Sequence, residues 1–252
     1  MRLGALFGPL ADASKPRSIA DQAKRFEACG YQSLWSPQAI GRGFMFSDPF
    51  ITLATAAAVT TSVELGTAVV QVPLYHPGDL AHRVFSLMQT CGDRLVIGVG
   101  AGSTEADFIA YGRSYDDRFR NFTTSMIELR ELLATGRIDG YGLSPWPAVV
   151  GDGPPIFLGS WGNGVERAAR SFDGWIASAH YRTPEQVAEA LQRYRAAGGG
   201  RAIVSTIQLG PKTDLGETRE TLAGFAAAGF DDAVVMLLPG GPSPDDIRDL
   251  VD

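Results

Sequence analysis

Short apolar runs alternate with longer amphipathic segments along this chain. The runs of strand length cover residues 2–7, 33–36, 63–72, 94–99, 156–158, 175–179, 201–209 and 233–238. Each is followed by a segment whose apolar positions recur at helical spacing. Such alternation predicts parallel strands joined by crossover helices, because each return crossing places a helix on the face of the sheet.

Residue types at the segment ends support the predicted helices. Asp48 is placed to cap a helix with Pro49 in its first turn, and Thr183 is placed to cap another. Gly30 and Gly229 follow the last apolar positions of two further helices. The predicted helical segments are 18–30, 48–62, 79–90, 104–111, 118–133, 165–171, 183–197, 217–228 and a short one from 243.

Eight strand–helix units in 252 residues predict an α/β fold, a closed (β/α)₈ TIM barrel forming a single domain over residues 1–252. Residues 136–153 are rich in glycine and proline and predict a shortened insertion between strands four and five. A doubly wound sheet is the alternative, because Gly98–Ser103 resembles a dinucleotide turn. Ser103 replaces the third glycine of that motif, which lies in the fourth unit instead of the first, so the barrel is favoured.

Composition narrows the class of partner. The formal charge of -6 and the isoelectric point near 5.1 argue against a nucleic-acid or anionic-membrane surface. No stretch approaches 18 apolar residues, and the first residues lack a signal-peptide pattern, so a cytoplasmic protein is expected. Cys29 and Cys91 lack metal-ligand spacing and are interpreted as small core residues.

The segment 154–175 combines a strand, a glycine-rich turn and a helix start. The apolar run 156–158 leads into Gly159, Ser160, Trp161, Gly162 and Asn163, and a helix follows. Backbone N–H groups and the positive end of a helix dipole favour an anion such as phosphate. An ordinary loop whose glycines only relieve backbone strain stays open as the alternative.

In a barrel, reactive groups lie at the carboxyl ends of the strands. These ends carry no neighbouring pair of acids and no lysine, and only His76 and His180 of the three histidines lie near them. No metal site is therefore expected, and glycosidase or Schiff-base chemistry finds no candidate residues. The remaining aromatic, hydroxyl, amide and glycine surface suits a flat conjugated cofactor that carries a phosphate.

Five blocks follow one another along the chain: RLGALFG, EACGYQSLW, DPFITLATAAAVTTSVELGTAVVQVPLYHP, CGDRLVIGVGAGS and PPIFLGSWGNGVERAARSFDGW. Together they resemble the bacterial luciferase-like monooxygenase superfamily, which includes flavin monooxygenases and oxidoreductases that depend on the deazaflavin coenzyme F420. The resemblance covers most of residues 1–179 and weakens after that.

This resemblance implies a barrel with FMN or coenzyme F420 across its mouth, a small-molecule substrate and a homodimer. It places the phosphate at Gly159, Ser160, Gly162 and Asn163. A cis peptide near Ala68 and Val69 would lie against the ring, and Gly100, Gly102 and Ser103 would lie near the ring edge or the phosphate. Trp161 is expected either to cover the phosphate or to contact a second subunit.

The chain departs from the family where catalysis is concerned. Ser36-Pro37-Gln38 stands where many members carry histidine at the end of strand two, and strand four lacks the arginine that bacterial luciferase uses for the phosphate. Gln38 can form hydrogen bonds but cannot shuttle a proton. His180 is the best remaining titratable candidate, with a solvent-exposed rim residue as its alternative. His76 precedes Pro77 at a helix start and is expected to be structural.

The leading hypothesis is an F420- or FMN-dependent oxidoreductase that performs hydride transfer or monooxygenation, with Gln38 and His180 as candidate catalytic residues. A catalytically degenerate barrel that binds a flavin and acts as a carrier or partner subunit is the second hypothesis. A phosphate-binding isomerase or aldolase would need a lysine or glutamate at a strand end. Substrate choice is expected to depend on residues 41–47 and 136–153.

Overall fold

The structure is a computed structural model that describes residues 1–8, 18–151 and 153–251. The main sheet contains β1 (Arg2–Leu6), β2 (Ser33–Ser36), β3 (Glu64–Thr67), β4 (Val70–Gln71), β5 (Leu95–Gly100), β8 (Ile156–Gly159), β9 (Gly174–Ser178), β10 (Arg201–Leu209) and β11 (Asp232–Leu237). The helices are α1 (Ser18–Ala28), α2 (Pro49–Ala57), α3 (Pro77–Cys91), α4 (Glu105–Ala110), α5 (Arg118–Thr135), α6 (Gly164–Ser171), α7 (Pro184–Ala196), α8 (Leu215–Ala228) and α9 (Pro244–Arg248).

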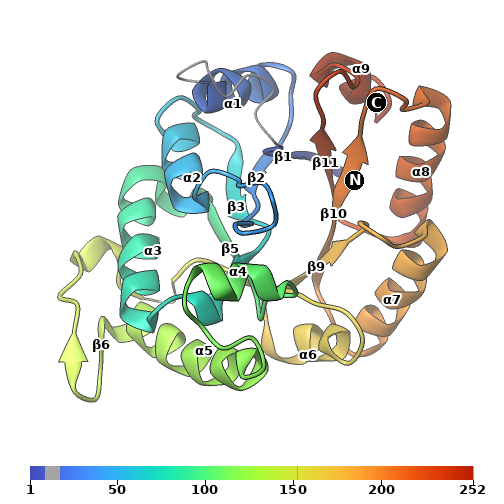
Figure 1. The fold of residues 1–252 in the computed structure, drawn as a ribbon. Helices are drawn as coiled ribbons and strands as arrows, with labels where there is room; N and C mark the ends of the chain where they lie inside the picture. The colour runs from blue at the N-terminus through green and yellow to red at the C-terminus, as the bar shows by residue number, and fades with distance from the viewer. Residues whose placement is uncertain (9–17, 152, 252) are drawn as a thin grey trace.

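The sheet closes on itself. Its strand order is β3-β2-β1-β11-β10-β9-β8-β5-β4, and a further pairing of β3 with β5 completes the ring. β3 and β4 are successive parts of one barrel strand, so the nine strands of the sheet form an eight-stranded parallel barrel. Figure 1 shows the helices arranged around these strands. The predicted (β/α)₈ barrel is therefore confirmed, and the doubly wound alternative is wrong.

Several predicted helix ends are confirmed at the level of individual hydrogen bonds. The Asp48 carboxylate accepts the N–H groups of Phe50 and Ile51 at 2.9 and 3.1 Å. Thr183 and Gln186 form a reciprocal capping box at the start of α7. His76 Nδ1 accepts the Gly78 N–H at 3.1 Å, which confirms its structural role. None of the helices in the described residues is long and apolar enough to cross a membrane.

Several boundaries differ from the sequence prediction, three of them through a change in local structure. The strand predicted over 63–72 is interrupted, and its last residue opens a 3₁₀ turn, Val72–Leu74. The helix predicted to reach residue 62 ends at Ala57. The interval 136–153 contains a small hairpin of β6 (Arg137–Ile138) and β7 (Tyr141–Gly142) and a 3₁₀ turn, Pro147–Val149. The predicted short insertion therefore contains local structure that the sequence did not indicate.

Alternate side chains of each strand point to opposite faces, and this produces two hydrophobic layers. The barrel interior is filled by Leu6, Trp35, Val96, Phe157, Ile176, Ile203, Val234 and Met236. A larger core lies between the strands and the helices and includes Phe7 and Cys91, so both are packing residues. Cys29 is half-buried and is a free thiol, so the prediction of a small core residue holds fully only for Cys91.

An ion-pair network joins the starts of four barrel strands. Arg201 on β10 forms paired hydrogen bonds with Glu64 on β3 at 2.7 and 2.8 Å and with Asp232 on β11 at 2.8 and 2.9 Å. Arg2 on β1 lies 3.6 Å from Glu64 and 3.5 Å from Asp232. Because the strands are parallel, these residues lie at the end of the barrel opposite the strand carboxyl ends.

Candidate active site

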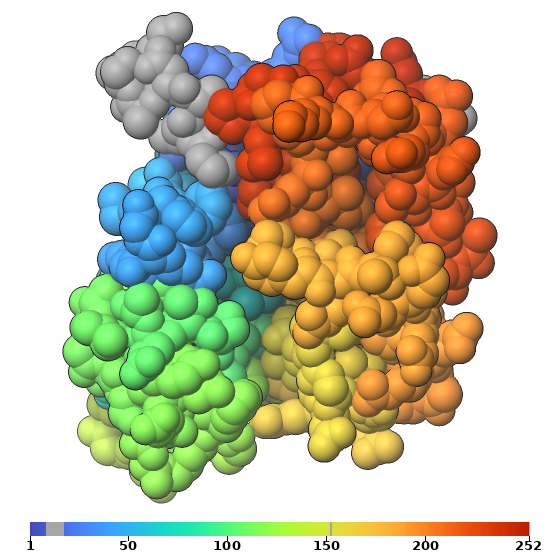
Figure 2. All heavy atoms as spheres, turned by 45° about the vertical axis from the view of Figure 1, so that its right-hand side comes forward, coloured from blue at the N-terminus to red at the C-terminus, as the bar shows by residue number. Residues whose placement is uncertain are grey.

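The carboxyl ends of the strands form the mouth of the barrel, where barrel enzymes carry their reactive groups. Phe46, Ala68, Val69 and Leu238 are partly buried there and pack on the interior core. Figure 2 shows a hollow between the light-blue and green residues of the first half of the chain and the gold and orange residues of the second. A partly exposed apolar floor of this kind suits one face of a flat conjugated ring.

The peptide bond between Ala68 and Val69 is cis, at the position that the family resemblance implied. The Val69 side chain fills the space beside two predicted cofactor-binding glycines. A Cβ atom at Gly159 would lie 2.6 Å from Val69 Cγ1, and one at Gly100 would lie 2.8 Å from Val69 Cγ2. Packing against Val69 is therefore enough to explain why both positions are glycine. Their contact with a cofactor stays a prediction.

The predicted phosphate turn leads from β8 into α6. Ser160 Oγ donates to the Gly164 carbonyl at 2.8 Å, and the Ser160 carbonyl accepts the Trp175 indole N–H at 3.0 Å. Gly162 is exposed with φ +61°, and a Cβ atom there would meet nothing within 4 Å. The Asn163 side chain makes no capping hydrogen bond. The turn is thus anchored at Ser160 and open at Gly162 and Asn163.

Trp161 connects this turn to the loop after β9. Its ring packs edge-on against Trp175 at 5.8 Å, and the Arg182 guanidinium lies 5.1 Å from its ring centroid. Arg193 donates to the Gly162 carbonyl at 2.9 Å and also pairs with Glu166. Two arginines therefore lie beside the turn, although strand four supplies none.

Gln38, at the end of β2, is the centre of a buried polar network. Its Oε1 accepts the backbone N–H of Gln71 at 2.8 Å, and its Nε2 donates to the Tyr75 hydroxyl at 2.6 Å. Gln71 Nε2 in turn donates to Asp107 at 2.7 Å. Gly102, with φ +87°, lies against Gln71 Oε1, which has no hydrogen-bond partner in the described part of the chain.

Asp107 on α4 is fully buried and was missed by the sequence analysis. Its carboxylate accepts hydrogen bonds from the Arg42 guanidinium and from the backbone N–H of Ile40 at 3.2 Å. Burial opposes ionisation of this carboxyl, but the bonds from Arg42 and Gln71 outweigh it and hold the Asp107 pKa below its ordinary value. Asp107 thereby ties the loop after β2 to the loop after β5.

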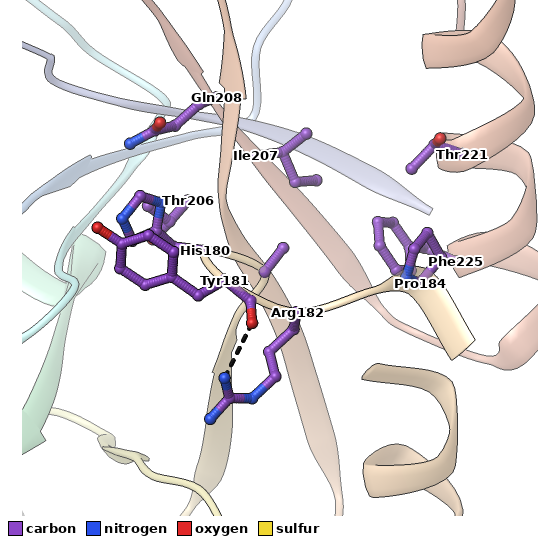
Figure 3. A pocket seen from close by; sticks show the side chains of 10 residues that line it. His180, Tyr181, Arg182, Pro184, Thr206, Ile207, Gln208, Thr221 and Phe225 are labelled. Carbon is purple, nitrogen blue, oxygen red and sulfur yellow. Dashed lines mark hydrogen bonds between the residues drawn. The ribbon is translucent and has the colours of Figure 1, made fainter. Parts of the chain in front are cut away.

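His180 belongs to a different part of the mouth. It lines a cavity of about 280 Å³ with residues of the loop after β9, of β10 and of α8, and Gln38 is not among the lining residues (Figure 3). The His180 ring lies 3.6 Å from that of the exposed Tyr181. Thr206 and Gln208 supply polar groups, and Ile207 and Phe225 supply apolar surface. The two predicted catalytic residues therefore lie in different parts of the mouth: His180 lines the cavity, and Gln38 belongs to the buried hydrogen-bond network.

The remaining predicted site residue, Ser103, is exposed at the end of the β5 loop, where its carbonyl accepts the Tyr115 hydroxyl at 3.1 Å. Of two residues that the sequence prediction missed, one had a signal in the sequence. Arg182 follows His180 by two positions and so belongs to the same loop. Asp107 lies within a helix pattern, where an acidic residue is usually solvated, and only the fold brings it to Arg42.

A family model described as luciferase-like monooxygenase matches residues 3–223. In sequence, the chain is 32% identical over 136 residues to 4-hydroxyprotoasukamycin monooxygenase of Streptomyces nodosus subsp. asukaensis, covering 52% of this chain and 37% of that protein. The match therefore spans little more than a third of the curated relative.

Solved structures share the fold at low sequence identity. Monooxygenase RslO1 from Streptomyces bottropensis superposes with a TM-score of 0.79 at 18% identity, covering 99% of this chain and 96% of that one. An F420-dependent secondary alcohol dehydrogenase in complex with an F420-acetone adduct gives 0.74 at 15%, covering 99% and 98%. The oxygenating constituent of 3,6-diketocamphane monooxygenase from Pseudomonas putida, in complex with FMN, gives 0.68 at 16%, covering 100% and 83%.

Proposed function

We propose that this chain, which belongs to the luciferase-like monooxygenase family, is an oxidoreductase that binds FMN or coenzyme F420 in the barrel mouth and acts on a small organic substrate. The observation that carries the proposal is that the apolar floor of the mouth, formed by Phe46, Ala68, Val69 and Leu238, lies next to the turn after β8. Val69 of the floor contacts Gly159, the residue at which that turn begins. A flat ring joined to a phosphate needs an apolar surface and an anion-binding turn in one mouth.

The residues of the chain fit such a group. The floor at Ala68 and Val69 is only partly buried, so one face of a ring can rest on it. The turn at Gly162 is open, and Asn163 leaves the start of α6 uncapped by any side chain. Backbone N–H groups at a helix start, with the positive charges of Arg182 and Arg193 nearby, favour a phosphate.

The bound ring would supply hydride transfer or the activation of oxygen. The chain itself binds, orients and shields the reactants. The turn holds the phosphate, the floor excludes water from one ring face, and the Gln38 network fixes the polar wall at the end of β2. The cavity beside His180 is the site that we assign to the substrate, where the imidazole supplies a hydrogen-bonding group.

Titration of the purified protein with FMN and with coenzyme F420, followed by cofactor fluorescence, tests the cofactor proposal. One of the two is expected to bind at micromolar concentration or better, and riboflavin, which lacks the phosphate, is expected to bind more weakly than FMN. Failure of both cofactors to bind contradicts the proposal.

Turnover is tested separately, with the cofactor that binds and a panel of small ketones, alcohols and aromatic compounds. Cofactor-dependent oxidation or reduction of a panel member is the expected result. Tight binding without turnover would instead support a carrier or partner subunit, for which the engagement of both Gln38 side-chain groups with Tyr75 and Gln71 is the relevant observation.

A further inference from the structure

Strand β10 contains one extra residue near the mouth of the barrel. Its residues on either side of this point pair in order with β11, but Ser205 and Thr206 lie together opposite the single residue Val234. This arrangement is a β-bulge, which leaves one residue unpaired and interrupts the alternation of side chains between the two faces of a sheet. The residues after the bulge therefore face the opposite way from what a regular strand would give.

The bulge turns Gln208 toward the interior of the barrel. Ile203, before the bulge, belongs to the interior core, whereas Ile207, after it, belongs to the core between the strands and the helices. In a regular strand these two residues would share a face, because they are four positions apart. Gln208 pairs with the interior residue Met236 of β11, and Figure 3 shows Gln208 and Ile207 on opposite sides of β10. The extra residue therefore directs an amide into the mouth in place of an isoleucine.

Thr206 adopts a backbone conformation that is costly for a β-branched residue. Its φ angle is +62°, in the left-handed region. Three residues other than glycine have a positive φ in the described part of the chain, and two of them, Tyr181 and Thr206, line the cavity beside His180. Strain of this kind persists where the surrounding structure enforces it, and it is concentrated at functional sites. The bulge is thus maintained at the cavity against an energetic cost.

Two polar groups of β10 are unpaired within the described residues. The Ser205 Oγ atom has no hydrogen-bond partner there, although the residue is only 1% exposed. The Gln208 amide is exposed at the cavity and also forms no hydrogen bond with a described residue. The residues that line the cavity include no aspartate or glutamate, so an ammonium group would find no carboxylate there. The Gln208 amide instead suits an uncharged oxygen group, to which it can donate.

We propose that Gln208 binds the substrate by donating an amide hydrogen bond to a carbonyl or hydroxyl oxygen of a small apolar molecule in the cavity beside His180. The bulge at Thr206 is the feature that positions this amide. The inference rests on the proposed function, which assigns the cavity to the substrate. A β10 strand without the extra residue would present Ile207 at this place and would offer the oxygen no donor.

Binding of two matched probes to the purified protein, measured by ligand-observed NMR without added cofactor, tests the inference. Acetophenone carries a carbonyl oxygen, and ethylbenzene has the same ring and a similar shape without that oxygen. Gln208→Leu removes the amide and is expected to weaken acetophenone binding about three- to tenfold. Ethylbenzene binding is expected to stay the same or to become slightly tighter, because leucine is apolar.

A second variant changes the chemistry of the amide while keeping its shape. Gln208→Glu replaces the donor by a carboxylate, so acetophenone binding is expected to weaken. Binding of 1-phenylethylamine is expected to become about tenfold tighter, because its ammonium group then finds a carboxylate in the cavity. A purely structural role of Gln208 would not move the two affinities in opposite directions.

Control variants separate Gln208 from its surroundings. Gln192→Leu removes an exposed glutamine of α7, and Thr206→Val keeps the branched shape at the bulge without the hydroxyl. Both are expected to leave acetophenone binding unchanged, and thermal unfolding reports the folding of each variant. Thr206→Gly keeps the bulge and relieves its strain, so the thermal midpoint is expected to rise by about 2–4 °C with the preference for acetophenone retained.

Equal effects of Gln208→Leu on the two probes, or no binding of acetophenone to the wild-type protein, overturn the inference. Weaker acetophenone binding in Thr206→Val would assign the bond to the Thr206 hydroxyl and overturn the role of Gln208. A lower midpoint in Thr206→Gly would overturn the bulge as a strained positioning feature. Because the probes are measured without cofactor, failure of FMN and F420 to bind would contradict the proposed function alone.

Discussion

Asp107 is a buried charged residue at the mouth of the barrel. It is fully buried, and its partners come from two separate segments: Ile40 and Arg42 from the loop after β2, and Gln71 from β4. Removing one member of a buried charged pair leaves the other poorly solvated, which is more costly than losing an exposed pair. The Asp107 carboxylate therefore contributes stability through charge as well as shape.

Asp107→Asn is expected to lower the free energy of unfolding by about 3 kcal/mol at neutral pH. Because the folded state depresses the Asp107 pKa, this stabilisation is present above the unfolded-state value and is lost as the pH falls toward the folded-state value. Urea unfolding at several pH values should show the difference between wild type and variant shrinking on acidification. Asp79→Asn, which breaks an exposed pair with Arg83, serves as the control and should cost less than about 1 kcal/mol.

Val69 and Gly159 offer a second test at the level of single residues. Gly159→Ala would place its Cβ atom 2.6 Å from Val69 Cγ1, so overpacking is expected to cost about 2 kcal/mol. Adding Val69→Ala removes the clash and should restore part of this loss, beyond what the two single changes predict together. Thermal unfolding without cofactor measures this coupling. Additive effects would show that Gly159 is glycine for another reason.

The contacts of individual side chains were the least predictable feature from sequence. Gly100 and Gly159 were predicted to bind the cofactor, which stays a prediction, whereas the side chain against which both pack, Val69, comes from another part of the chain. Gln38 was identified as a polar residue at a strand end, whereas its partners Tyr75 and Gln71 could be found only after the strands were registered. Long-range contacts of this kind have no local sequence signal.

Among the elements, the turn between β8 and α6 carries the phosphate prediction. Asn163→Asp adds a negative charge at the start of α6, where aspartate normally stabilises a helix, so the folding stability should be unchanged or higher. A phosphate at the same place would be repelled. FMN binding is therefore expected to weaken about tenfold, while riboflavin binding stays the same.

The control for this change is Gln192→Glu, which adds the same charge at an exposed position of α7. It should alter neither FMN nor riboflavin binding. Equal weakening of both ligands by Asn163→Asp would place the phosphate elsewhere and attribute the effect to the ring or to the turn conformation.

Element types were largely predictable because capping residues and apolar spacing act locally. Asp48, Thr183 and Gly229 mark helix ends in the sequence and serve as helix caps in the structure. The hairpin of β6 and β7 was missed because each strand has only two residues, too few for an alternating pattern. The α3 start at Pro77 was predicted two residues late, although proline favours the first helical position.

At the scale of the whole molecule, the barrel could be predicted because strict alternation of strands and helices leaves few topologies. The number and order of apolar runs indicated eight barrel strands. A closed barrel of eight strands requires neighbouring strands to pair all the way around, as the pairing of β3 with β5 does. The network of Arg201, Glu64 and Asp232 could not be predicted. Arg201 lies 137 positions from Glu64 and 31 positions from Asp232 in sequence, and each of the three lies at an ordinary strand start.

The Arg201 guanidinium makes the four short hydrogen bonds of this network, and Arg2 adds two longer contacts. Arg201 binds Glu64 and Asp232 each through two nitrogen–oxygen contacts, a geometry that a lysine ammonium cannot reproduce. Arg201→Met leaves the fully buried Asp232 carboxylate without its main partner and is expected to cost about 4 kcal/mol. Arg201→Lys restores the charge but not the fork, so it should recover less than half of this loss.

The network spans β1, β3, β10 and β11, so the loss should affect the whole barrel instead of one segment. Urea unfolding of both variants, followed by tryptophan fluorescence and by circular dichroism, is expected to give coincident transitions at lower midpoints. Arg193→Lys, which alters a more exposed pair with Glu166, should cost about 1 kcal/mol or less. If Arg201→Lys were as stable as wild type, charge alone would explain the contribution of the network. If the fluorescence and circular-dichroism transitions had different midpoints, the strands would be joined mainly by their backbone hydrogen bonds, and these side chains would act locally.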